Sequence, residues 1–178
     1  MNKKQIALVA KEIATHHKGK PLAVLADVSD SMSDRAPSGL SKFMELRAAL
    51  ISSLARREDY SLVAFAGDVE MVESPAKLYN TGGSTRLANA LRCVAKQGAE
   101  RLLIVTDGHP TDSPPDSCLA VLDELFPWVR VDVLFIGPPD DSSATALLRR
   151  VARNGGVMYS TERHYLQSLT LLLEGRAL

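Results

Sequence analysis

The residues best suited to chemistry in this chain follow directly on a short apolar run. Residues 22–26 are all apolar, as in a buried strand, and Asp27, Ser29 and Ser31 come next at alternate positions. One carboxylate and two hydroxyls are hard oxygen donors, which suit Mg²⁺ or a related divalent cation rather than zinc or copper. Because ligands of open α/β sheets bind beyond the carboxyl ends of strands, this motif predicts a cation site.

Two further stretches carry matching oxygens. Thr85 follows a Gly-Gly-Ser stretch and opens a helical pattern, and the glycines there permit a close backbone approach. Asp107 ends the apolar run 101–106 and precedes a glycine that permits a turn. In a doubly wound sheet of order 3-2-1-4-5-6 the two apolar runs are neighbours at the switch point, so the two carboxylates are expected to meet there.

The elements that must position these side chains alternate along the chain. Strands are expected at 22–26, 60–66, 69–72, 101–106, 129–136 and 157–160, and helices at 40–56, 85–97, 117–126, 143–153 and 164–174. This alternation predicts an α/β fold, a doubly wound, Rossmann-like and mostly parallel sheet with helices on both faces. A two-residue Gly-Asp turn before 69–72 indicates a hairpin, and hence one antiparallel edge strand. We expect one domain over 1–178, with an amphipathic N-terminal helix within 1–18.

Composition narrows the classes of function. Apolar residues make up 46% of the chain, and 21 basic residues balance 21 acidic ones, so the sequence favours a globular domain with no nucleic-acid or membrane partner. The apolar runs are too short to cross a bilayer. The two cysteines, Cys93 and Cys118, are expected to be reduced and to pack within helices, which together with the N-terminal pattern predicts a cytoplasmic protein.

Taken together, the three stretches resemble a known family. The DxSxS motif, the threonine before Leu-x-x-Ala-Leu and the Thr-Asp-Gly motif are similar to the metal-ion-dependent adhesion site of the von Willebrand factor A domain, and the order of elements fits over nearly the whole chain. The site residues that the resemblance implies are Asp27, Ser29, Ser31, Thr85 and Asp107.

The resemblance also implies roles. The two serines would bind Mg²⁺, or Mn²⁺ or Ca²⁺, directly, while Thr85 would bind directly or through water according to state, and the two aspartates largely through water. The remaining position would take an Asp or Glu of a protein partner, such as an AAA+ ATPase or another complex subunit. Neutral hydroxyls leave much of the ion's charge available, which favours docking of a carboxylate. We therefore expect a non-catalytic, cation-dependent protein-binding module.

Other interpretations fit parts of the pattern. Each motif alone also suits an ordinary turn or helix cap. A Mg²⁺-dependent phosphoryl-transfer enzyme or phospho-receiver would use Asp27 as nucleophile or ligand, but no lysine stands beside either strand end in the sequence. A structural domain with a vestigial site is a third reading. Arg35 and Arg86 are candidates to grip an acidic partner, Asp112 suits a loop better than a second metal site, and Trp128 is expected to pack at a strand start.

Overall fold

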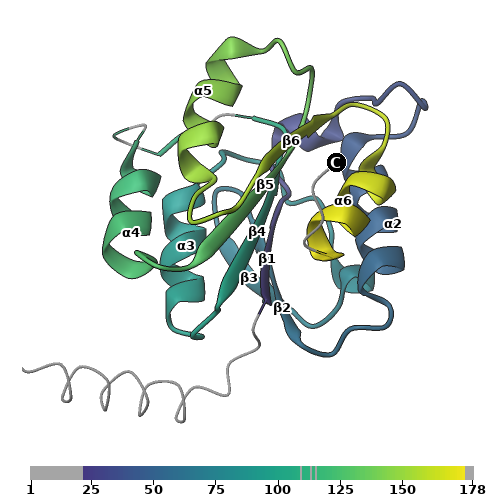
Figure 1. Ribbon diagram of the computed structural model, residues 1–178. Helices are drawn as coiled ribbons and strands as arrows, with labels where there is room; N and C mark the ends of the chain where they lie inside the picture. The colour runs from purple at the N-terminus through teal and green to yellow at the C-terminus, as the bar shows by residue number, and fades with distance from the viewer. Residues whose placement is uncertain (1–21, 109, 113, 115, 175–178) are drawn as a thin grey trace, which may run out of the picture.

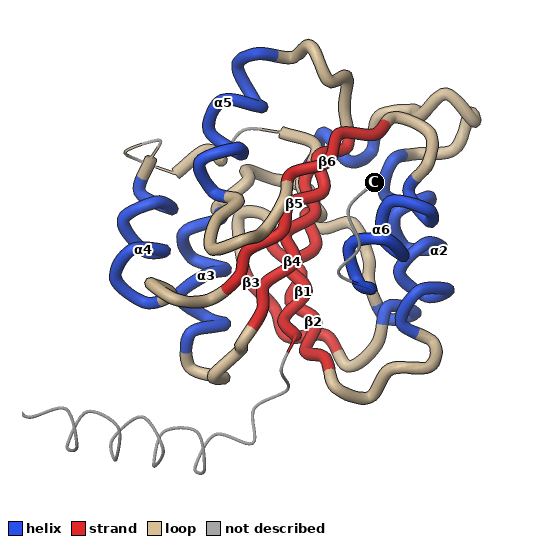
Figure 2. Tube along the Cα trace, in the orientation of Figure 1, coloured by secondary structure: helices blue, strands red, loops and turns tan. Residues whose placement is uncertain are grey.

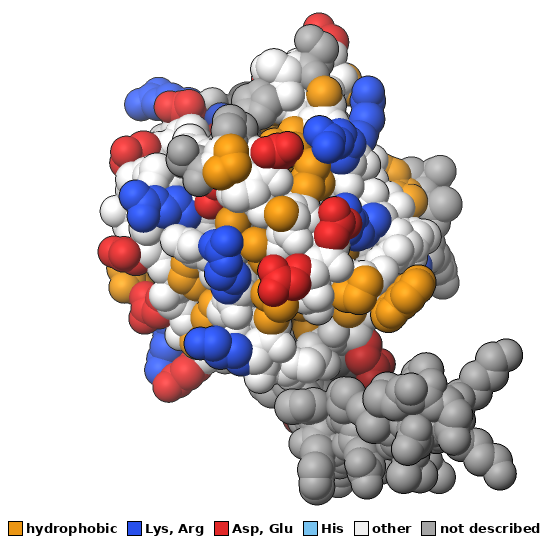
Figure 3. Space-filling view, turned by 90° about the vertical axis from the view of Figure 1, so that its left-hand side faces the viewer, with side chains coloured by type: hydrophobic (Ala, Val, Ile, Leu, Met, Phe, Trp, Pro, Cys, Tyr) orange, Lys and Arg blue, Asp and Glu red, His pale blue; other side chains and the backbone are white. Residues whose placement is uncertain are grey.

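A computed structural model describes residues 22–108, 110–112, 114 and 116–174 of the chain (Figure 1). The N-terminal helix expected within 1–18 lies outside the described residues. None of the helices within these ranges is long and apolar enough to cross a membrane. The face over α3, α4 and α5, seen in Figure 3, carries basic and acidic side chains interspersed with hydrophobic ones rather than a block of like charge.

The described strands form one sheet with the predicted order, β3-β2-β1-β4-β5-β6. All pairs are parallel except β2 with β3, which confirms the antiparallel edge strand. The strands are β1 (Leu22–Asp27), β2 (Tyr60–Phe65), β3 (Val69–Val72), β4 (Arg101–Thr106), β5 (Arg130–Ile136) and β6 (Met158–Thr161). Because β1 pairs with both β2 and β4, it lies at the switch point, and its carboxyl end is next to that of β4.

Helices cover both faces of this sheet (Figures 1 and 2). One face carries α3 (Leu87–Ala95), α4 (Ser117–Leu125) and α5 (Ser142–Val151), and the other carries α2 (Lys42–Leu54) and α6 (Tyr165–Glu174). Each layer encloses its own apolar cluster, and the α/β architecture expected from the sequence is confirmed.

The uniformly apolar composition of β1 follows from this sandwich. Ala23 and Leu25 pack in the cluster beneath α3, α4 and α5, whereas Leu22, Val24 and Ala26 pack beneath α2 and α6. Because both faces of this strand are buried, its sequence is continuously apolar and does not alternate between apolar and polar residues. Every residue of β1 is buried, and the strand delivers Asp27 to the sheet edge with no freedom to slip in register.

Local details depart from the sequence-based expectations. Phe65 pairs with Val69, so three residues rather than two form the hairpin turn between β2 and β3. Short 3-10 helices, η1 (Asp30–Ser33) and η2 (Pro75–Lys77), lie in stretches where no helix was expected. The expectation that Trp128 packs was wrong, because its side chain is 89% exposed. Cys93 and Cys118 are free thiols, as expected.

Candidate metal centre

The loop after β1 is shaped by local hydrogen bonds and by one buried anchor. The Ser29 backbone N–H donates to Oδ1 of Asp27 over 2.9 Å, so the carboxylate folds back on the turn that follows it. Ser29 holds the N-cap position of η1, where its carbonyl accepts the Met32 N–H over 3.1 Å, and Met32 within η1 is fully buried in the α2 and α6 cluster. This anchor fixes the loop, and it sets the two hydroxyls on the same side: Ser29 Oγ and Ser31 Oγ lie 3.3 Å apart.

Asp27 is fully buried, and among the described residues its carboxylate accepts hydrogen bonds from neutral donors alone. In addition to the Ser29 N–H, the Thr106 hydroxyl at the end of β4 donates to Oδ2 over 2.6 Å. Burial raises the pKa of Asp27 to about 6, although the hydrogen bonds from Ser29 and Thr106 oppose the rise, while the nearby charge of Asp107 adds to it. A buried carboxylate with this pKa gains from the arrival of a cation, which favours its ionised form.

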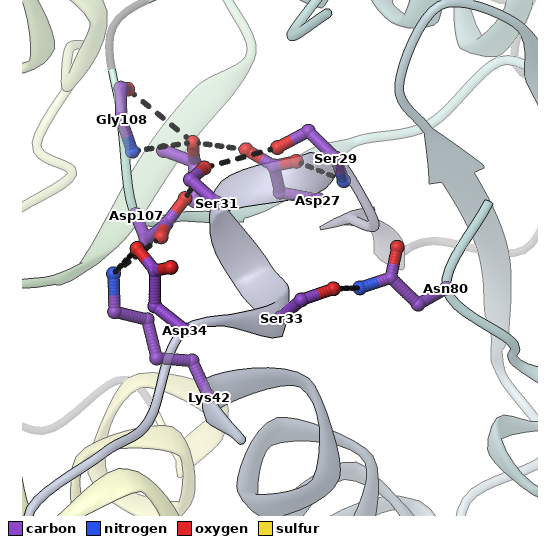
Figure 4. Close-up of polar contacts among 10 residues, drawn as sticks. Asp27, Ser29, Ser31, Ser33, Asp34, Lys42, Asn80, Asp107 and Gly108 are labelled. Carbon is purple, nitrogen blue, oxygen red and sulfur yellow. Dashed lines mark hydrogen bonds and ion pairs between the residues drawn. The ribbon is translucent and has the colours of Figure 1, made fainter. Parts of the chain in front are cut away.

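Asp107 joins the same cluster from β4. Its side chain is fully buried, and Ser31 Oγ donates to its Oδ1 over 2.7 Å (Figure 4). A chain of polar contacts therefore connects Ser29, Ser31 and Asp107, and Thr106 links β4 to Asp27. The structure thus brings together four of the five side chains that the sequence singled out.

Thr85, the fifth, is placed by backbone contacts. The Gly82 N–H donates to the Val28 carbonyl over 3.1 Å, and the Asp30 N–H donates to the Gly83 carbonyl over 3.2 Å, so this loop lies directly against the one after β1. Both glycines have positive φ, and a Cβ at Gly82 would collide with the Asp30 carboxylate. The predicted role of the glycines in close approach is confirmed.

The Thr85 side chain is buried, but among the described contacts its hydroxyl shares no hydrogen bond with the other four residues. Nor does it cap the helix that follows. α3 begins at Leu87, and its Ala88 N–H donates to Oδ2 of Asp112 over 3.0 Å. Asp112 therefore caps a helix, and burial raises its pKa.

The site also contains a lysine that sequence reasoning missed. Lys42 Nζ lies 2.7 Å from Oδ2 of Asp107 and 3.7 Å from Oδ2 of Asp34 (Figure 4). No lysine is adjacent to either strand end in the sequence, as expected. In the folded chain, however, Lys42, the first residue of α2, lies beside the end of β4. The available signal was its position in the first helical turn, where a cation is disfavoured unless acidic groups face it.

A cavity of about 440 Å³ opens beside Asp107 and Lys42. Arg35 lines it, together with Tyr165 at the start of α6, but the exposed Arg35 side chain shares no described hydrogen bond or ion pair with the five site residues. Burial raises the pKa of the Tyr165 hydroxyl, and nearby carboxylates add to the effect. Arg86 instead lines a separate hollow with Asp112.

The donor set is made of few carboxylates. Within the described ranges, no three His, Cys, Asp or Glu side chains are grouped so that they could hold a metal ion. The cluster at the β1 and β4 ends has two carboxylates, and its remaining donors are hydroxyls. Its chemistry therefore suits a hard cation that retains water, such as Mg²⁺, rather than a structural zinc site.

Comparisons with known proteins identify the fold. No protein-family model and no curated protein matches the chain. Among solved structures it is similar to a von Willebrand factor type A protein from Catenulispora acidiphila, with a TM-score of 0.64 and 15% identity over 84% of this chain and 40% of that one. It is also similar to the Deinococcus radiodurans RO (RSR) protein, with a TM-score of 0.58 and 13% identity over 89% of this chain and 34% of the other.

These similarities show a von Willebrand factor A-like fold. The chain spans well under half the length of both solved proteins. At such low identity the likeness concerns the backbone arrangement, and the chemistry of the site must be argued from its own residues.

Proposed function

We propose that this chain is a divalent-cation-dependent protein-binding module that docks an Asp or Glu side chain of a partner on a metal ion. The observation that carries the proposal is the cluster at the carboxyl ends of β1 and β4, where Asp27, Ser29, Ser31 and Asp107 converge. Asp27 is buried there with neutral donors alone among the described contacts, and a cation would complete its electrostatics.

In this proposal the hydroxyls of Ser29 and Ser31 would bind the ion directly, and the hydroxyl of Thr85 would bind it directly or through water. The carboxylates of Asp27 and Asp107 would accept hydrogen bonds from water bound to the ion. When bound, Mg²⁺ would supply a Lewis-acidic position for an incoming carboxylate. Direct ligands that are neutral leave the ion's charge uncompensated, and this gives the incoming acid its binding energy.

One structural observation favours the alternative, a Mg²⁺-dependent phosphoryl-transfer enzyme or phospho-receiver. Lys42 is close to Asp107 and provides the positive charge that such sites use. Against it, Asp27 is fully buried and both of its oxygens accept hydrogen bonds, so it is poorly placed for attack on phosphorus. Incubation with acetyl phosphate and Mg²⁺ followed by intact-mass measurement tests this alternative, and a phosphate adduct lost in Asp27→Asn would establish it.

Calorimetry of the purified chain with Mg²⁺ and Mn²⁺ tests the docking proposal first. We expect binding by the wild type and its loss when both Ser29 and Ser31 are changed to alanine, with Ser38→Ala, an exposed loop serine, as the matched control. Equal binding by the double variant would remove the metal site from the proposal.

Affinity capture tests the second half. A partner retained in Mg²⁺ should be released by chelator, and the Ser29 and Ser31 double variant should not retain it. Substitution of the partner's contacting acid by its amide should abolish capture, and an AAA+ ATPase subunit among the captured proteins would match what the family resemblance implies. A partner that binds equally well in chelator would contradict cation-dependent docking.

A further inference from the structure

Lys42 occupies a position that its own helix disfavours. It is the first residue of α2, where the unpaired backbone N–H groups create a positive potential that repels an ammonium group. Its Nζ nevertheless lies 2.7 Å from Asp107 and 3.7 Å from Asp34, and its side chain is 22% exposed. Because Asp34 is exposed and Asp107 is fully buried, the contact with Asp107 is what fixes the ammonium group.

This contact reaches directly into the candidate metal centre. Asp107 divides its two oxygens between Ser31, which donates to Oδ1, and Lys42, which bonds Oδ2. Figure 4 shows Lys42 and Asp107 facing one another, with Ser31 and Ser29 next along the chain of contacts. Asp27 and Asp107 bring two negative charges, and Lys42 offsets one of them.

We infer that Lys42 is a specificity-determining residue that weakens the hold on the cation and strengthens the hold on the partner's carboxylate. The inference rests on the proposed function and adds to it that the metal and Lys42 both attract the incoming carboxylate. A cation entering the site meets one net negative charge rather than two, so it binds less tightly. An incoming carboxylate meets the metal and an ammonium group together, so it binds more tightly.

The cavity beside the site supports the second half of this inference. Lys42 and Asp107 both line it, so this ion pair borders the space that an incoming acidic side chain would enter. Arg35 lines the same cavity, but its exposed side chain has no ion pair with Asp107 among the described contacts. Arg35 is therefore the matched control, a nearby cation of equal charge outside the Asp107 contact.

The experiment measures two affinities in four proteins: the wild type, Lys42→Met, Lys42→Arg and Arg35→Met. Calorimetry at constant ionic strength gives the Mn²⁺ affinity. Titration of acetate into the Mn²⁺-loaded proteins, followed by water-proton relaxation, gives the carboxylate affinity. We expect Lys42→Met to bind Mn²⁺ roughly fivefold more tightly and acetate roughly fivefold more weakly. Lys42→Arg should resemble the wild type, and Arg35→Met should change either affinity by less than about twofold because exposed charges are screened.

Opposite changes in the two affinities are the signature, because a merely structural lysine would not produce them. If Lys42→Met binds both Mn²⁺ and acetate as the wild type does, or shifts both in the same direction, the inference is overturned while the proposed function stands. If Lys42→Met and Arg35→Met behave alike, the effect is one of general charge, which also overturns it. If none of the proteins binds Mn²⁺, the proposed function fails and takes the inference with it.

Discussion

Two fully buried aspartates near opposite edges of one sheet have opposite electrostatic surroundings. Asp132, near the amino end of β5, has Arg101 Nη2 at 2.7 Å from Oδ2 and Arg130 Nη2 at 3.0 Å from Oδ1. Asp27, at the carboxyl end of β1, accepts from the Ser29 N–H and the Thr106 hydroxyl, and among the described residues no cationic side chain bonds it.

The difference separates a structural charge from a candidate functional one. Arg101 also donates to the carbonyls of Leu172 and Leu173, so the Asp132 cluster ties the end of α6 to the sheet. The buried carboxylate of Asp132, which has a structural role, is thus neutralised by two guanidinium groups. Leaving Asp27 with neutral donors costs stability, and such a cost is typical of sites that bind something.

The largest expected effect is the loss of stability when the Asp132 carboxylate is removed. Asp132→Ala should lower the free energy of unfolding by roughly 3 to 5 kcal/mol, because it leaves two guanidinium groups facing a vacated, water-poor site. Urea denaturation in chelator at pH 7.5 measures the loss. The control is Asp123→Ala, which removes an exposed partner of Arg153 and should change stability by less than about 1 kcal/mol. A loss no larger than that of the control would mean that Asp132 is no structural anchor.

The next effect is a pH dependence carried by Asp27. Its pKa in the folded chain is about 6, above the ordinary 3.8, so between these values the folded protein holds a proton that the unfolded chain has released. Stability must therefore fall as pH rises through this window, by up to about 3 kcal/mol from this group alone. We expect the difference in unfolding free energy between Asp27→Asn and wild type, measured in chelator, to grow by most of this amount from pH 4 to pH 7. A constant difference would show that Asp27 ionises without cost.

A smaller effect connects the same carboxylate to the metal. Mg²⁺ at ten times its dissociation constant should add about 1.4 kcal/mol to wild-type stability at pH 7.5. The gain should shrink at pH 5, where protons compete for Asp27, and Asp27→Asn should gain much less at either pH. Thermal melts with Mg²⁺ and with chelator provide the measurement. An equal gain at both pH values would place the cation away from this carboxylate.

The smallest effect is the loss of stability when one arginine partner of Asp132 is removed. Arg130→Met removes one of the two guanidinium partners, and the remaining Arg101 keeps Asp132 paired, so we expect a loss of about 1 kcal/mol. Arg101→Met should cost more, because this residue also holds the last carbonyls of α6. Urea denaturation ranks the two variants, and the reverse order would mean that the contact with α6 contributes little.

Much of the architecture was predictable from the sequence. The strand order and the edge hairpin followed from apolar runs that alternate with amphipathic segments, and these patterns depend on short stretches of chain. The convergence of Asp27 and Asp107 followed from that order, because neighbouring parallel strands end at the same edge. Trp128 was misjudged because an aromatic residue after a proline gives no sign of which side of the strand start faces water.

The sequence by itself therefore determined the sheet, its order and the oxygens at the ends of β1 and β4. Only the tertiary structure decided which charges those oxygens meet: Lys42 reaches Asp107 from the far end of a loop, whereas Asp27 is left with a hydroxyl and an N–H. The physical reason is range. Strand and helix patterns repeat over a few residues, but the state of a buried carboxylate depends on groups that folding brings within about 4 Å from anywhere in the chain.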